Sequence, residues 1–163
     1  MSPPCPICQL HGDGVRRDEE EIARGALWLL RHHPAPAPLA GWLLLDARRH
    51  LGGPLDFTDH EAKTWGLAVR QASQLVRRLT GCDRVYAIAF GEGAPHLHLH
   101  LIPRSASDPA SAAWRVADLY RAVAAGERPP ADLRQVRQLV EAARALVDPA
   151  VLDGVEDRGT PRD

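Results

Sequence analysis

The segment His96-Leu-His-Leu-His-Leu-Ile102 decides the interpretation of this chain, because three histidines alternate strictly with apolar residues. Successive side chains of a β-strand point to opposite faces, so the histidines share one face and the leucines share the other. The leucine face can pack in a core while the histidine face carries chemistry. Imidazoles about 6.6 to 7 Å apart along a strand are too widely spaced to bind one metal ion together. The three histidines are therefore expected to serve adjacent but separate tasks.

The apolar pattern around this strand predicts an α+β domain. A helix begins with a capping box at Thr58 and Glu61 and ends before Gly81, a favoured left-handed stop. Strands are expected over 26–30, 41–45, 85–90 and 96–102, and further helices over 111–125 and 131–147. Residues 1–20 are polar and rich in turn formers. The order of strands, helix, strands and helices is typical of a mainly antiparallel sheet with helices packed on it.

Composition narrows the function classes. A chain of 163 residues with 45% hydrophobic and 25% charged residues has the make-up of one globular domain. The net charge of -1 argues against a general nucleic-acid binder, and no apolar run approaches the roughly 20 residues that cross a bilayer. The first residues lack the features of a secretion signal, and three cysteines are an odd number for a disulfide framework. We therefore expect a cytoplasmic protein.

A second motif lies near the amino end. Cys5 and Cys8 have the spacing with which a tight turn presents two thiolates to one tetrahedral Zn²⁺ ion. Such a pair needs two more ligands. His11 lies in the same short segment and could form a local three-ligand clip, and the two cysteines could also be free of metal. The residues alone leave these alternatives open.

The triad segment resembles the histidine triad superfamily of nucleotide hydrolases and transferases. The resemblance covers roughly residues 5–104 and includes four further features: Cys5-x-x-Cys8, Gly41 before an apolar strand, Arg48-Arg49-His50 before the long helix, and Pro103-Arg104 after the triad. It implies a five-stranded antiparallel sheet with a long helix, in a homodimer that joins two such sheets. The expected organisation is a catalytic domain with an amino-terminal zinc-binding segment over 1–104, a helical extension of that domain over 105–148 and a flexible tail over 149–163.

The resemblance also implies a reaction. His98 would attack the α-phosphorus of a nucleotidyl anhydride or phosphoramidate, and water would cleave the covalent nucleotidyl-histidine. His100 would bind the phosphoryl or leaving oxygen, and a backbone carbonyl is expected to hold the tautomer of His98. Similarity to zinc-containing members adds His50 and His96 to the two cysteines as ligands of a structural zinc. The alternatives are a nucleotidyl transferase or phosphorylase of the same fold, and a zinc-stabilised nucleotide-binding module without turnover.

The candidate substrate-binding residues lie on two segments. Backbone amides of Gly91 to Gly93 precede the triad strand and can donate to phosphate, although the Glu92 carboxylate repels phosphate unless it points away or is protonated. His33 closes the first predicted strand, where the resemblance places a nucleoside pocket. Arg31 stands where many members carry an acidic residue for the ribose hydroxyls, and is a candidate phosphate contact instead.

Overall fold

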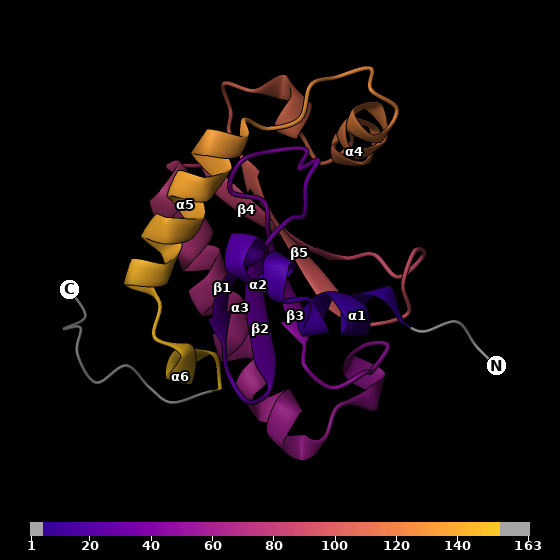
Figure 1. Cartoon of the computed structure of the whole chain (residues 1–163), viewed down its shortest axis with the longest axis vertical. Coiled ribbons are helices and arrows are strands. Elements are labelled where there is room, and N and C mark those ends of the chain that lie inside the picture. Colours follow the sequence, from indigo (N-terminus) through magenta and orange to yellow (C-terminus); the bar gives the residue numbers. More distant parts are fainter. Residues whose placement is uncertain (1–4, 154–163) are drawn as a thin grey trace.

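The computed structural model describes residues 5–153 and contains a five-stranded antiparallel sheet (Figure 1). The strands lie in the order β1-β2-β3-β5-β4. Their bounds are β1 Glu21–Arg24, β2 Trp28–His32, β3 Leu43–Ala47, β4 Arg84–Ala89 and β5 His98–Arg104. Every neighbouring pair is antiparallel. The predicted α+β class and five-stranded sheet are confirmed.

The main core lies between the sheet and the long helix α3, Asp59–Thr80. As predicted, Thr58 and Glu61 form a capping box at its start, and Gly81 ends it in the left-handed conformation with a φ of 66°. The buried leucines of the middle strands share a cluster with the small residues of this helix: Leu30, Leu45, Leu99, Leu101, Ala68 and Ala72. The leucines of the triad strand therefore form the sheet side of the core.

Three helices are associated with the other face of the sheet (Figure 1). They are α1, Pro6–Gly12, α2, Gly14–Glu20, and α4, Val116–Ala124. Helix α5, Leu133–Leu146, packs against both α3 and β1. Two 3-10 turns, η1 Pro54–Asp56 and η2 Pro109–Ser111, complete the connections. The triad face is therefore the one that α1, α2 and α4 cover.

The structure corrects several boundaries. The polar segment before residue 20 forms two short helices because the Asp13 side chain accepts from two amides at the start of α2. Strand β1 was not expected, and β5 begins at His98 rather than His96. Residues 149–152 of the expected tail form helix α6, Pro149–Leu152, and the Asp153 carboxylate accepts from the amides of Ala26 and Leu27. Residues 154–163 lie outside the described part of the chain.

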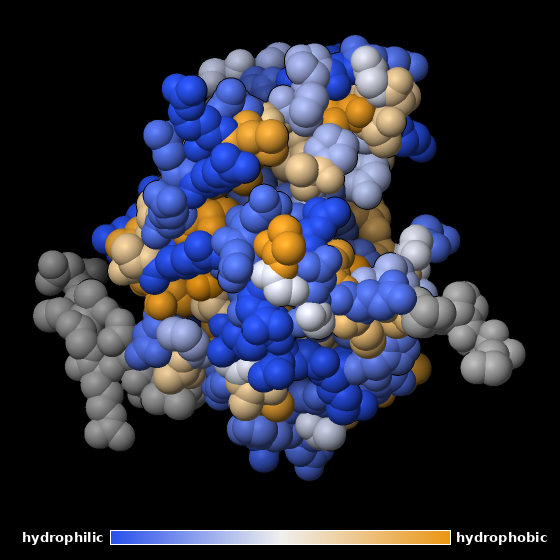
Figure 2. Space-filling view, in the orientation of Figure 1, coloured by the Kyte–Doolittle hydropathy of each residue, from blue (hydrophilic) through white to orange (hydrophobic). Residues whose placement is uncertain are grey.

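Figure 2 shows mainly hydrophilic residues on the face viewed, with hydrophobic residues in small groups between them. No helix within residues 5–153 combines the length and the apolar character that a membrane span requires.

Candidate active site and metal centre

Strand β5, which carries His98 and His100, lies between β3 and the edge strand β4. His98 lies opposite Asp46 and His100 lies opposite Leu44, so both imidazoles project from the face that α1 and α4 cover. Leu99 and Leu101 project into the core beneath. The alternation in the sequence thus places these histidines and leucines on opposite faces of the sheet, as predicted.

One hydrogen bond determines which nitrogen of His98 is reactive. His98 Nδ1 lies 2.6 Å from the carbonyl oxygen of His96. A carbonyl only accepts, so Nδ1 carries the proton and donates it. Nε2 then keeps its lone pair, and the side chain lines a cavity. His98 therefore has an unprotonated Nε2, and its Nδ1 has the backbone carbonyl partner that was expected from the sequence.

A different hydrogen bond gives His100 the opposite polarity. The indole Nε1 of Trp42 donates to His100 Nδ1 at 3.0 Å. An indole is a donor only, so His100 must accept at Nδ1 and carry its proton at Nε2. Burial, followed by the nearby His98 side chain, lowers the pKa of His100 to about 3, which keeps the ring neutral. Nε2 is buried and has no hydrogen-bond partner among the described residues, so it offers an unused N–H donor.

The cavity beside these histidines has a volume of about 540 Å³, within the usual range of ligand pockets. Its walls come from elements far apart in the sequence: α1, the segment before β3, the β4–β5 connection and α4. Much of the lining is apolar, from Ile7, Trp42, Phe90, Val116 and Tyr120. Glu92 and Arg121 are the charged side chains among the described lining residues. The cavity therefore fits a ligand with a large apolar part and a charged part.

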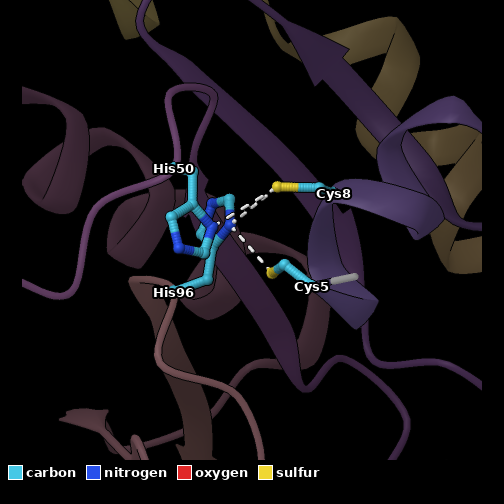
Figure 3. A group of neighbouring side chains, drawn as sticks. All are labelled: Cys5, Cys8, His50 and His96. Carbon is cyan, nitrogen blue, oxygen red and sulfur yellow. Dashed lines mark hydrogen bonds between the residues drawn. The ribbon is translucent and has the colours of Figure 1, made fainter. Parts of the chain in front are cut away.

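The predicted metal ligands meet at the start of α1 (Figure 3). Cys5 caps this helix and Cys8 lies in its first turn, while His50 follows β3 and His96 precedes β5. Their four ligand atoms lie within 4.8 Å of one another. The Nδ1 atom of His96 is 3.5 Å from each sulfur, and His50 Nδ1 is 3.5 Å from the sulfur of Cys8.

These residues fit a structural zinc ion. Bonds of about 2.0 to 2.3 Å to a tetrahedral Zn²⁺ place its ligand atoms roughly 3.3 to 3.8 Å apart, close to the observed spacing. His96 Nε2 donates to the carbonyl of Ala47 at 2.7 Å, which leaves Nδ1 unprotonated and directed at the two sulfurs. Four protein ligands leave no open position, so zinc here joins α1 to the sheet rather than acting on substrate.

His11 does not belong to this group. Its Nε2 instead lies 2.9 Å from the carboxylate of Asp46, although its ring packs edge-on against that of His96 with centroids 5.5 Å apart. The local clip of Cys5, Cys8 and His11 is therefore replaced by ligands from three separate segments.

The structure does not place Arg31 in the cavity. Its Nε donates to the buried Asp46 carboxylate at 2.6 Å, and the Arg31 residue is only 3% exposed. Burial acts to raise the pKa of Asp46, but the Arg31 charge and the His11 hydrogen bond bring it below its usual value. A buried carboxylate needs such a counter-charge, so Arg31 is committed to the fold.

Only some of the other predicted substrate-binding residues line the cavity. Glu92 and Gly93 line the cavity, whereas Gly91 and His33 do not. His33 is buried behind the triad with its ring centroid 6.3 Å from that of His100, and its Nδ1 donates to the carbonyl of Pro34. Trp42 and the residues of α4 line the site as well, and neither was predicted from the sequence. The one indication in the sequence was that Trp42 directly follows Gly41, which is among the residues that carry the family resemblance.

Comparisons with known proteins agree with this geometry. Neither the protein-family models nor the curated proteins contain a match. Among solved structures, a histidine triad protein from Bradyrhizobium japonicum is 25% identical with a TM-score of 0.59, covering 82% of this chain and 94% of that one. A zinc-bound histidine triad family protein from Mycobacterium smegmatis is 20% identical with a TM-score of 0.60, and the match covers 90% of this chain and 97% of that one. A histidine triad protein from Sinorhizobium meliloti is 17% identical with a TM-score of 0.60, and the match covers 83% of this chain and 95% of that one.

Proposed function

The chain belongs to the histidine triad superfamily, and on that premise we propose that it hydrolyses nucleotidyl phosphoanhydride or phosphoramidate bonds through a covalent intermediate on His98. The observation that carries this proposal is the pair of opposite tautomers on β5. His98 keeps a lone pair on a side chain that lines the cavity, and His100, two residues further along the same face, carries a buried N–H with no hydrogen-bond partner among the described residues. The ring centroids of the two residues lie 5.2 Å apart, which supports the proposal of a nucleophile beside a phosphoryl-oxygen donor.

The reaction follows from these two groups. His98 Nε2 attacks the α-phosphorus and a nitrogen–phosphorus bond forms. The leaving oxygen or nitrogen departs with the electron pair of the broken bond, and a leaving nitrogen takes up a proton from water as it departs. The His96 carbonyl stabilises the resulting imidazolium through the Nδ1 proton. Water then attacks phosphorus and loses a proton, the nitrogen–phosphorus bond breaks, and His98 returns to its neutral form. His100 Nε2–H donates to a phosphoryl oxygen, where negative charge grows in both steps.

Intact-protein mass spectrometry after rapid quenching tests this proposal. Wild type, His98→Ala and the control His60→Ala, at an exposed position on α3, are mixed with adenylylated and guanylylated substrates. Wild type and His60→Ala should gain the mass of one nucleotidyl group, and His98→Ala should not. A nucleoside diphosphate released only with added phosphate would indicate phosphorolysis. Binding without adduct or product would refute catalysis and leave a binding module.

We propose that two copies join through β4. This strand pairs only with β5 among the described strands, so its other edge exposes unpaired backbone groups that need cover. A homodimer that continues the sheet across this edge would satisfy them. Light scattering should then give twice the 17.8 kDa of one chain, and a monomer at micromolar concentration would refute the assignment.

A cytoplasmic location remains a proposal. Cys5, Cys8 and Cys82 form no disulfide, which agrees with a reducing compartment. Fractionation of cells that express the untagged chain checks this assignment.

A further inference from the structure

Helix α4 contacts the surroundings of the triad through a few side chains, although it lies outside residues 5–104. Val116 is buried in a small core cluster with Trp42 and Ile102. The ring of Tyr120 packs edge-on against His33, with centroids 5.5 Å apart, and Trp42 is the residue that holds the tautomer of His100. The same residues therefore anchor α4 and support the proposed catalytic histidines.

This helix brings the cavity its positive charge. Among the described residues that line the cavity, Arg121 is the only lysine or arginine, and it follows Tyr120 directly. The other candidate cation, Arg31, is paired with Asp46 away from the cavity. A substrate that carries several phosphates needs such a charge, because neutral imidazoles supply hydrogen bonds but no net charge.

Arg121 is free to turn toward a ligand. Its present partner is Asp118, one turn earlier on α4, with Nη2 2.6 Å from a carboxylate oxygen. The side chains of this pair are 73% and 68% exposed. An exposed ion pair within one helix contributes little net free energy, so an incoming phosphate can replace the carboxylate at low cost.

The arrangement of lining residues assigns a direction to the substrate. Phe90, Val116 and Tyr120 give apolar and aromatic surface on which a base can pack. Phe90 and Tyr120 are 39% and 45% exposed, and the Arg121 side chain is 73% exposed, as expected for a residue where the cavity opens to solvent. The part of the substrate that extends outward from the reacting phosphorus is the leaving group.

Building on the proposed function, we infer that α4 selects the substrate and that Arg121 binds the phosphates of the leaving group. The chain then favours nucleotidyl polyphosphates over phosphoramidates, whose leaving amine carries no phosphate. Glu92, the carboxylate of the same lining, opposes this preference and weakens it.

Steady-state kinetics with Arg121→Gln test the inference. The substrates are a dinucleoside tetraphosphate and an adenosine phosphoramidate, which share the transferred nucleotidyl group. Arg115→Gln is the control. It removes the same charge at the start of α4, and Arg115 lines a separate depression. For the tetraphosphate, KM should rise by about tenfold or more in Arg121→Gln with kcat within about twofold, since a charge-assisted hydrogen bond is lost. For the phosphoramidate, and for Arg115→Gln with either substrate, KM should change by less than about twofold.

Two results would overturn the inference: an unchanged tetraphosphate KM in Arg121→Gln, or an equal rise of KM for both substrates. If wild type turned over neither substrate, the proposed function would fail separately. Calorimetric titration with a methylene-bridged, non-hydrolysable analogue of the tetraphosphate would then test whether Arg121 binds its phosphates. A Kd at least about tenfold weaker in Arg121→Gln would support the role of Arg121, and equal Kd values in wild type and variant would refute it.

Discussion

Acidification from pH 7 to pH 5 should destabilise the folded chain through His33. This residue is 7% exposed, and burial lowers its pKa from the ordinary 6.5 to about 4. Below pH 6.5 the unfolded chain binds a proton at this position that the folded chain does not bind. The free energy of unfolding therefore falls as the pH falls, until the pH reaches the folded pKa. With about 1.36 kcal/mol for each unit of pKa difference, His33 alone accounts for a loss of about 2 kcal/mol between pH 7 and pH 5.

Urea unfolding at pH 7, 6 and 5 measures this loss in wild type and in His33→Asn. The asparagine amide can still donate to the Pro34 carbonyl that His33 Nδ1 contacts, but it does not titrate. The zinc ligands contribute equally to both proteins and cancel in the comparison. His33→Asn should lose about 2 kcal/mol less than wild type, and His60→Asn, at an exposed position, should match wild type. Equal losses in His33→Asn and wild type would refute the reasoning.

Three further predictions concern the metal, the tautomer and the buried ion pair. Cys5→Ser should lose stoichiometric zinc by metal analysis and lower Tm by roughly 10 °C by calorimetry, and a full zinc content would contradict the assigned ligands. Trp42→Phe removes the hydrogen-bond donor to His100, so kcat in steady-state assays should fall by about tenfold with little change in KM. An unchanged kcat would exclude a role for the His100 tautomer. Asp46→Asn leaves the buried Arg31 charge without its counter-charge and should cost about 3 to 5 kcal/mol in urea unfolding, and a loss below about 1 kcal/mol would show that Arg31 finds another partner.

Features that depend on short-range pattern could be predicted from the sequence. The alternation at 96–102 determines which side chains share a face, and the capping box with Gly81 sets both ends of α3. The zinc ligands needed the family resemblance in addition, because nothing local joins Cys5 to His50. The short elements α1, α2 and β1 were missed, because four to seven residues carry almost no periodic signal and depend on contacts with the rest of the chain.

Partners from distant segments explain the remaining differences. Arg31 was interpreted as a phosphate contact because its sequence neighbours do not reveal Asp46, which reaches it only through the pairing of β2 with β3. Arg121 could not be predicted for the same reason. Helix α4 reaches the cavity through aromatic contacts with residues far earlier in the chain, such as the contact of Tyr120 with His33. In both cases the tertiary partner, and not the residue type, determines the role.

The zinc ligands also bear on the order in which the chain folds. Cys5 and His96 are separated by 91 residues, and Cys8 and His50 by 42. Closing loops of this length costs chain entropy before any bond to the metal can repay it. The full set of ligands therefore exists only after β5 has paired with β3, and we expect metal uptake to be a late kinetic step. In refolding experiments, zinc uptake would then report the completion of the sheet.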